Sequence, residues 1–201
     1  MDEGKLIKKA SNGNGGVFSS MDKNGILEEM QSKGTKWIFI GGVDNVLSQM
    51  VDLNLIGLAI KNGTKIAAKS VLKTSPKEKA GVFCKQNGKI KIIEYTEIPK
   101  ELAEETKKNG ELVFGEMNII ANLFSIEAIE KASKKDMPYH VAFKKASFIN
   151  EKNELILPTE PKCYKFEKFI FDSFALFDEI SILRGKREED FAPIKNKERR
   201  R

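Results

Sequence analysis

Residues 36–45 read KWIFIGGVDN, an apolar run that stops at two glycines followed by valine, aspartate and asparagine. A continuous apolar run of this length is typical of a strand that is buried on both faces of a sheet. An amphipathic helix is expected before it at residues 22–32, with Asp22 as its N-cap and Gly34 as its C-terminal stop. This order of helix, strand and loop predicts an α/β protein with a mixed, mainly parallel sheet flanked by helices.

Asp44 and Asn45 come directly after this strand. In open α/β sheets the ligand crevice lies beyond the carboxyl ends of the parallel strands, so both residues are candidates for a binding site. A carboxylate there can hold Mg²⁺ as a hard oxygen ligand while the metal bridges phosphate oxygens. The alternative is an aspartate that only caps the following turn.

The rest of the chain continues the alternation of helices and strands. Helices are expected at residues 52–61, 99–108, 126–134 and 167–177, and strands at 65–72, 82–85, 89–94, 140–145 and 179–183. Residues 113–125 are extended or mixed, and Asn87-Gly88 is the strongest signal for a two-residue hairpin turn. No repeat or change in composition divides the sequence, which predicts one domain over residues 1–201 with a basic C-terminal tail at 185–201.

The composition excludes several classes of protein. It is 40% hydrophobic and 32% charged, which is ordinary for a soluble globular chain. No apolar stretch approaches the roughly 20 residues of a membrane-spanning helix, and the first residues have no apolar core for a signal peptide. We therefore expect a cytoplasmic protein without a membrane partner. Two distant cysteines and a single histidine exclude a zinc site built from several His or Cys ligands.

The net charge of +6 is concentrated near the C-terminus. Residues 184–201 contain eight Lys or Arg against four Asp or Glu, and the remainder of the chain is nearly balanced. Such a tail is usually solvated, and only sometimes contacts a polyanion. No nucleic-acid partner is therefore expected, although a basic nucleic-acid-binding domain stays as the third hypothesis.

Seven short stretches of the sequence, taken in order, resemble the UDP-N-acetylglucosamine and UDP-glucose pyrophosphorylases. They are Asn12–Phe18, Gly42–Asn45, Ile93–Ile98, Asn118 with Ala121–Phe124, His140–Lys145, Phe166–Asp172 and Phe191–Asn196. Their order and spacing carry the resemblance, which covers nearly the whole chain and looks closest to the N-acetylglucosamine branch.

The resemblance implies a Rossmann-like nucleotide-diphospho-sugar transferase fold and a uridylyltransferase that makes UDP-N-acetylglucosamine and pyrophosphate from UTP and N-acetylglucosamine 1-phosphate. The sugar phosphate oxygen would attack the α-phosphorus of UTP in line while pyrophosphate leaves. Catalysis in such a reaction is positioning plus the charge of Mg²⁺ and lysines. N-acetylgalactosamine or glucose stays open as the sugar, so a UDP-glucose pyrophosphorylase is an alternative.

The resemblance also assigns the phosphate and uridine contacts. It implies that Asp44 is the metal carboxylate, with Asn45 supporting it, and that Lys195 binds phosphate. The turn Asn14-Gly15-Gly16 would lie against the uridine, since missing β-carbons let the backbone approach a ligand. The alternatives are a plain turn at residues 14–16 and a solvated lysine in a basic tail at Lys195.

For the sugar, the resemblance implies that Glu94 and Asn118 hold hydroxyl groups. It also implies that Phe169 and Phe171 wall the pocket for the N-acetyl group. By spacing alone, these phenylalanines are core residues. Two lysines after a strand, Lys144 and Lys145, leave open which of them faces the site. His140, just before them, is expected to be structural, because this reaction needs no histidine base.

Members of this family are longer and carry a glycine-rich loop for the triphosphate before the matching region. Nothing in residues 1–35 resembles that loop. We therefore expect an incomplete fold that self-associates or pairs with a missing N-terminal half, and a chain that lacks full turnover alone. The second hypothesis is a non-catalytic fragment that keeps a UDP-sugar or sugar-phosphate pocket.

Overall fold

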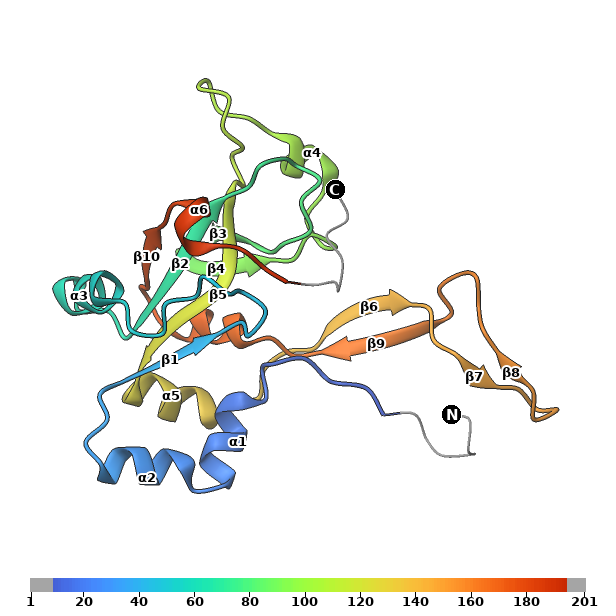
Figure 1. The fold of residues 1–201 in the computed structure, drawn as a ribbon, viewed down its shortest axis with the longest axis horizontal. Helices are drawn as coiled ribbons and strands as arrows, with labels where there is room; N and C mark the ends of the chain where they lie inside the picture. Colours follow the sequence, from blue (N-terminus) through green and yellow to red (C-terminus); the bar gives the residue numbers. More distant parts are fainter. Residues whose placement is uncertain (1–8, 195–201) are drawn as a thin grey trace.

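A computed structural model describes residues 9–194 as a mixed α/β body with a protruding two-stranded arm (Figure 1). The body holds a six-stranded sheet and its helices, and the arm extends away from them. The strands of the sheet are β1 (Trp37–Gly41), β2 (Ile66–Leu72), β3 (Val82–Gln86), β4 (Lys89–Ile93), β5 (Glu116–Ser125) and β10 (Ser181–Arg184). The helices are α1 (Val17–Lys23), α2 (Ile26–Ser32), α3 (Leu53–Asn62), α4 (Lys100–Glu104), α5 (Ile126–Ser133), the 3₁₀ helix η1 (Ile170–Leu176) and α6 (Arg187–Asp190).

The arm consists of two short antiparallel pairs. The pair next to the body is β6 (His140–Lys144) with β9 (Cys163–Glu167), and the outer pair is β7 (Phe148–Ile149) with β8 (Leu155–Ile156). Both lie on the same side of the body in Figure 1.

The sheet is mixed, but its pairing is mainly antiparallel. The strand order is β10-β2-β5-β3-β4, and β1 also pairs with β5. Of these pairs, only β10 with β2 is parallel, whereas β5 runs antiparallel to β1, β2 and β3. The prediction of a mainly parallel sheet is therefore wrong for the described residues. Alternating helices and strands do not fix which strands become neighbours, and here the long strand β5 lies between strands of opposite direction.

Several boundaries follow from local chemistry that the sequence displays. Asp52 caps α3, because its carboxylate accepts hydrogen bonds from the backbone nitrogens of Asn54 and Leu55. Gly63 ends the same helix with a φ of +66°. Asn87 and Gly88 both have positive φ between β3 and β4, as a tight hairpin turn requires.

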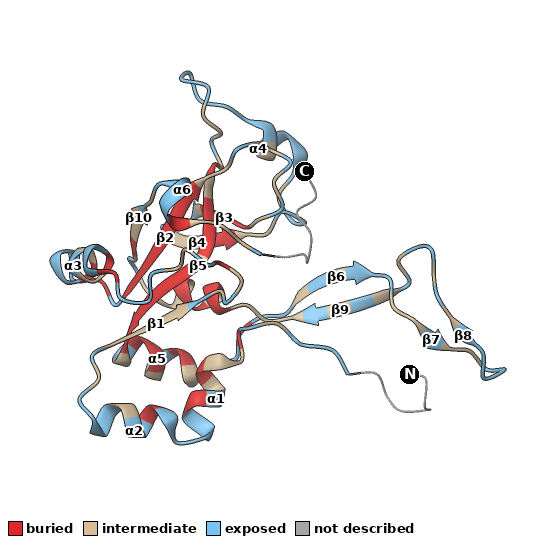
Figure 2. Ribbon diagram, in the orientation of Figure 1, coloured by how far each residue is buried: buried red, intermediate tan, exposed pale blue. Residues whose placement is uncertain are grey.

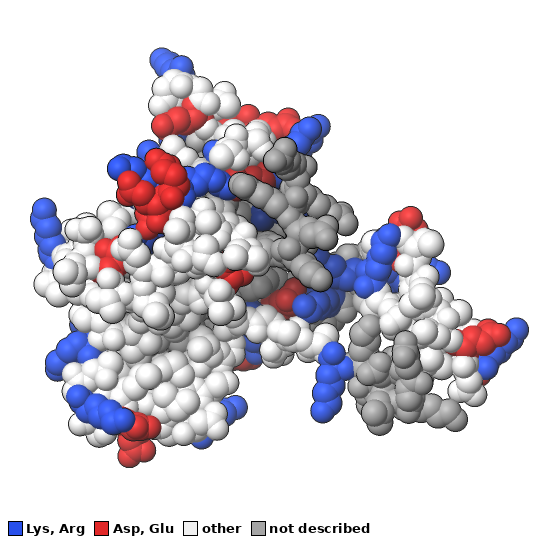
Figure 3. Space-filling view, in the orientation of Figure 1, with Lys and Arg blue, Asp and Glu red and all other residues white. Residues whose placement is uncertain are grey.

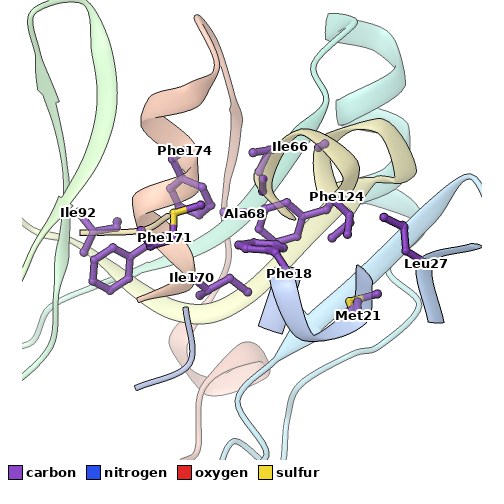
Figure 4. Close-up of a cluster of buried hydrophobic side chains, with 14 of the residues drawn as sticks. Phe18, Met21, Leu27, Ile66, Ala68, Ile92, Phe124, Ile170, Phe171 and Phe174 are labelled. Atoms are coloured by element: carbon purple, nitrogen blue, oxygen red, sulfur yellow. The ribbon is translucent and has the colours of Figure 1, made fainter. Parts of the chain in front are cut away.

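Helices pack on both faces of the sheet and enclose the buried side chains (Figure 2). The larger cluster lies among α1, α5, η1 and the sheet, and it centres on Phe18, Phe124 and Phe174 (Figure 4). The second cluster lies under α3 and includes Leu55 and Leu123. Phe124 and Leu123 are neighbours on β5 but belong to different clusters, because successive side chains of a strand point to opposite faces.

Two predicted helices are divided or replaced by other elements in the structure. The helix expected at 22–32 is two helices, and Asp22 lies inside α1 while Gly25 precedes α2, so Asp22 is not an N-cap. The helix expected at 167–177 begins as the end of β9 and continues as η1, with Phe169 extended between them. An aromatic-rich sequence has no strong helical preference, so packing decides its backbone.

The C-terminal segment is docked as far as the structure describes it. Residues 187–190 form α6, and the side chain of Asp190 is buried. The expectation of a solvated tail is therefore wrong for residues 185–194. On the face drawn in Figure 3, most of the body is uncharged, and small patches of Lys or Arg and of Asp or Glu lie mainly near its edges. Within residues 9–194, no helix is long and apolar enough to cross a membrane.

Candidate functional site

A distortion in the middle of β5 opens the sheet. One edge of β5 pairs with β3 at Met117 and with β1 from Ala121 onward. Between these contacts Ile120 has a φ of +53°, and the side chain of Asn118 accepts a hydrogen bond from the Ile120 nitrogen at 3.1 Å. A β-branched residue with positive φ is strained and needs surrounding contacts to hold it. Such strain concentrates at functional sites.

A cleft of about 510 Å³ lies at this distortion. Its lining combines six residues that the sequence singled out and that are far apart along the chain: Asn14, Asp44, Glu94, Asn118, Phe169 and Phe171. The loop after β1, the turn after β4, the middle of β5 and the start of η1 thus meet at one place.

The glycine turn is held against the segment that carries the two phenylalanines. The backbone nitrogen of Gly15 donates to the carbonyl of Lys168 at 2.8 Å, and the side chain of Asn14 accepts from the Ile170 nitrogen at 2.9 Å. A β-carbon at Gly15 would lie 2.8 Å from the Phe169 nitrogen, so this close approach requires glycine. Gly16 is the N-cap of α1, and neither Gly15 nor Gly16 lines the cleft.

Asp44 is half-buried at the cleft wall. Its backbone carbonyl accepts a hydrogen bond from Ile194 at 2.8 Å, but its carboxylate makes no hydrogen bond or ion pair with any residue in 9–194. No group of three or more His, Cys, Asp or Glu in the described part of the chain could hold a metal ion. A lone free carboxylate fits Mg²⁺ bound chiefly by substrate phosphates and water.

Asn45 is buried behind Asp44 rather than in the cleft. Its side chain donates to the carbonyl of Asp190 at 2.8 Å and accepts from the nitrogen of Ala192 at 2.9 Å. These bonds hold residues 190–194 beside the loop after β1. Asn45 therefore supports the wall that carries Asp44, and its own amide is already used.

Glu94 and Asn118 both line the cleft, and each lies next to Gly81. Burial raises the pKa of Glu94 above its ordinary value, the neighbouring charge of Glu97 adds to this rise, and His140 opposes it. The backbone of Gly81 also lies close to the Glu94 carboxylate, since a β-carbon at Gly81 would lie 2.7 Å from the Oε1 atom of Glu94. The Nδ2 atom of Asn118 makes no hydrogen bond to other residues in 9–194, so it remains free to donate to a ligand.

Phe169 and Phe171 form a stacked pair with ring centroids 5.0 Å apart. Phe171 is only 4% exposed and belongs to the main core cluster, while Phe169 is half-buried at its edge. The expectations of a core residue and of a pocket wall are therefore compatible for this pair. The rings give one end of the cleft an apolar surface.

Two of the three lysines in the sequence prediction lie in the described part of the chain. Lys195 lies outside the described residues. Lys144 lines a small hollow next to the cleft, together with Glu94, His140 and Phe169, whereas Lys145 lines a groove on the arm. Neither of the paired lysines lines the main cleft.

The structure also adds cleft residues that sequence reasoning missed. Tyr95 and Lys79 line the cleft, as does Arg187, which pairs with Glu78. Tyr95 directly follows Glu94, and this adjacency could have drawn attention to it. Nothing local marks Arg187, because its place depends on the docking of α6.

Comparison with known proteins identifies the family of the chain. The family model described as UTP–glucose-1-phosphate uridylyltransferase matches residues 4–199. A UDP-N-acetylhexosamine pyrophosphorylase-like protein 1 from Xenopus tropicalis is 36% identical over 97% of this chain and 39% of its own length. The UDP-N-acetylglucosamine pyrophosphorylase of Saccharomyces cerevisiae is 34% identical over 94% of this chain and 41% of its own. The chain thus spans about two fifths of these curated relatives.

Solved structures give the same result. The structure of a putative UDP-N-acetylglucosamine pyrophosphorylase from Entamoeba histolytica superposes with a TM-score of 0.84 at 39% identity, over 95% of this chain and 49% of that one. The enzyme from Trypanosoma brucei, solved with an inhibitor, gives a TM-score of 0.78 at 31% identity, over 93% and 38% of the two chains. The chain therefore belongs to the UTP–glucose-1-phosphate uridylyltransferase family, among relatives named UDP-N-acetylglucosamine pyrophosphorylases.

Proposed function

We propose that this chain forms the sugar-binding and metal-binding part of a uridylyltransferase that makes UDP-N-acetylglucosamine and pyrophosphate from UTP and N-acetylglucosamine 1-phosphate. The observation that carries the proposal is the cleft itself. The carboxylate of Asp44, which has no partner within residues 9–194, lines the same cavity as a polar pair, Glu94 and Asn118, and an apolar wall, Phe169 with Phe171. This combination suits a ligand with a charged phosphate and an acetylated sugar.

The roles follow from the chemistry of each group. Glu94 can accept hydrogen bonds from sugar hydroxyls, and the free amide of Asn118 can donate one. Asp44 would hold Mg²⁺, which supplies positive charge to the phosphate oxygens when it is bound. The chain's own contribution is to orient the sugar phosphate, because catalysis of phosphoryl-type transfer depends on positioning and electrostatics.

We infer further that the sheet is part of a larger Rossmann-like sheet. Within residues 9–194, β1 pairs only with β5, so its other edge can accept a further strand. A second polypeptide or further chain in that place would supply the triphosphate contacts. The alternative function, sugar-nucleotide binding without turnover, would need only the cleft described above.

A titration of the purified chain with UDP-N-acetylglucosamine and Mg²⁺ tests the pocket, beside an assay of pyrophosphate release with UTP and N-acetylglucosamine 1-phosphate. We expect Glu94→Gln to weaken binding about tenfold or more, since a hydrogen bond to a charged group contributes about 1.5–3 kcal/mol. Glu101→Gln, on the exposed helix α4, is the matched control. Equal affinity of both variants, or the same affinity for UDP as for the sugar nucleotide, would contradict the proposed sugar contacts.

The metal assignment has its own test. Asp44→Asn should remove the Mg²⁺ dependence of sugar-nucleotide binding while leaving metal-free binding within about twofold. Pyrophosphate release by the wild-type chain would favour the enzyme, and binding without release would favour the binding fragment. Mg²⁺ dependence that persists in Asp44→Asn would remove Asp44 from the metal site.

A further inference from the structure

His140, the single histidine of the chain, is the first residue of β6, one of the two strands by which the arm extends from the body (Figure 1). Its Nδ1 atom is 2.8 Å from a carboxylate oxygen of Glu97, and its Nε2 atom is 3.0 Å from one of Asp172. A neutral imidazole donates from one nitrogen only, whereas both partners here are acceptors when ionised. The geometry therefore matches a protonated ring that donates to two carboxylates.

The two carboxylates belong to two segments that contribute residues to the cleft: the polar wall at residues 94–97 and the aromatic wall at residues 169–172. Glu97 closes the turn that begins at Glu94, because its backbone nitrogen donates to the Glu94 carbonyl at 2.9 Å. Asp172 lies in η1 directly after Phe171, and its backbone nitrogen bonds to the Phe169 carbonyl at 3.3 Å. One side chain thus connects the polar wall to the aromatic wall.

The ring also touches the aromatic wall directly. Its centroid lies 5.0 Å from that of Phe169 and 5.9 Å from that of Phe171. A cation at such distances from aromatic rings is attracted by their electrons. The side chain of His140 is only 19% exposed, so water competes weakly for its two hydrogen bonds.

We propose that the protonated side chain of His140 is a positioning group that fixes Glu94 relative to Phe169 and Phe171, so that the sugar end of the cleft is fully assembled only while the histidine carries its proton. The bridge itself follows from the contacts above. Its consequence for sugar binding rests on the proposed function. A purely structural histidine would make the same hydrogen bonds, but its protonation would not couple the conformations of the two walls.

The surrounding charges favour the protonated form of His140. Within residues 9–194, the charged groups around His140 are Glu94 and Glu97 in the turn after β4, Glu167 on β9, Asp172 in η1 and Lys144 on β6. Glu167 is itself paired with Lys165 at 2.8 Å. Burial alone would lower the pKa of His140, but the hydrogen bonds to Glu97 and Asp172 outweigh it and raise that pKa above the ordinary value. Burial raises the pKa of Asp172 as well, and its bond to His140 only partly offsets this.

The sign of the pH dependence follows. Because the pKa of His140 is higher in the folded chain than in the unfolded chain, the bridge stabilises the fold below the unfolded pKa, and this contribution is lost as the pH rises through the folded pKa. Above that pH the ring can donate only one hydrogen bond. One of the two walls then loses its connection.

A pH titration followed by NMR tests the bridge without any ligand, since one histidine gives one set of imidazole signals. We expect its midpoint to lie above about 6.5, the ordinary value. The amide signals of residues 94–97 and 169–172 should follow the same midpoint, and Glu97→Gln and Asp172→Asn should each lower it. Glu101→Gln is the control and should leave it unchanged. Amides of only one wall following the histidine, or a midpoint unaffected by both bridge variants, would overturn the proposal.

A second measurement separates the bridge from the proposed function. The affinity of the wild-type chain for UDP-N-acetylglucosamine should fall by up to about tenfold per pH unit above the histidine midpoint, because one proton is linked to binding. In His140→Gln this slope should disappear. Binding that is independent of pH in the wild type would overturn the coupling. If the chain binds no sugar nucleotide at any pH, the proposed function fails, and the amide titration alone decides whether His140 joins the two walls.

Discussion

The Oδ1 atom of Asn45 accepts a hydrogen bond from the backbone nitrogen of Ala192 at 2.9 Å. The residues are far apart in sequence, yet the Asn45 side chain is 5% exposed, and its other end donates to the carbonyl of Asp190. The backbone of Asp44 accepts from Ile194 beside it. The loop that presents Asp44 is thus built jointly from the end of β1 and the segment after α6.

Asn45→Ala should lower the free energy of unfolding by about 1–3 kcal/mol, because it leaves the Ala192 nitrogen and the Asp190 carbonyl without their partners. Gln49→Ala serves as the control, since that amide side chain is exposed and should change stability by less than about 0.5 kcal/mol. Urea denaturation of the two variants measures the difference. Equal stability would mean that residues 190–192 find other partners and that Asn45 does not anchor them.

Two neighbouring glycines of the turn at 13–16 should respond differently to alanine. A β-carbon at Gly15 would lie 2.8 Å from both the Lys168 carbonyl carbon and the Phe169 nitrogen, which are backbone atoms that cannot move alone. Gly15→Ala should therefore cost about 1–3 kcal/mol, as overpacking does. At Gly16 there is open space and a φ of −75°, so Gly16→Ala should be neutral or stabilising by up to about 1 kcal/mol.

Thermal unfolding of both glycine variants checks this pair of expectations. A shift of the Phe169 signals in NMR spectra of Gly15→Ala would trace the cost to the contact with residues 168–169. A destabilised Gly16→Ala would show that the turn tolerates no side chain at either position. The close approach of residues 168–169 to Gly15 would then not be the reason why both positions carry glycine.

Local signals in the sequence were enough to predict several elements. The helix predicted at 52–61 corresponds to α3 within one residue at each end, and Asn87-Gly88 predicted the β3–β4 turn. The placement of Asp44 at a strand end also agrees with its position in the cleft. Each of these depends on a few adjacent residues, so a short window of sequence contains the necessary information.

Features that depend on distant contacts could not be predicted in this way. The positive φ of Ile120 occurs where the pairing of β5 changes from β3 to β1. No sequence signal near position 120 predicts it. The bridge of His140 to Glu97 and Asp172 joins three segments that only the fold brings together. The docking of α6 likewise depends on buried partners in β2 and before α3, so its sequence reads as a charged tail.

Those partners form a buried group of three charges. The ammonium of Lys69 on β2 lies 2.5 Å from the carboxylate of Asp52 and also contacts that of Asp190 on α6. All three residues are less than a tenth exposed. Burial by itself would raise the pKa of Asp52, but its hydrogen bonds to Lys69 and to the backbone of Leu55 outweigh burial and lower it. The cation therefore joins the start of α3 to α6 through the sheet.

Lys69→Met should cost about 3–5 kcal/mol at neutral pH, because it leaves two buried carboxylates without a cation. Lys33→Met removes an exposed ion pair with Glu29 on α2 and should cost less than about 1 kcal/mol, which makes it the matched control. In the triple variant Lys69→Met, Asp52→Asn and Asp190→Asn, much of the loss should return, since no unpaired charge remains. Chemical denaturation of all three proteins measures these differences.

Lowering the pH should affect the folding stability of the wild-type protein and of Lys69→Met in opposite directions. In the wild type the pKa of Asp52 is lower in the folded than in the unfolded chain, so this carboxylate stabilises the fold above its unfolded pKa, and that contribution is lost as the pH falls through the folded pKa. Without Lys69, burial would raise the pKa of Asp52 instead, and lowering the pH towards 4 should narrow the gap in stability between the two proteins. A gap that stays constant between pH 7 and pH 4 would mean that Lys69 stabilises the fold by packing its aliphatic chain and not by its charge.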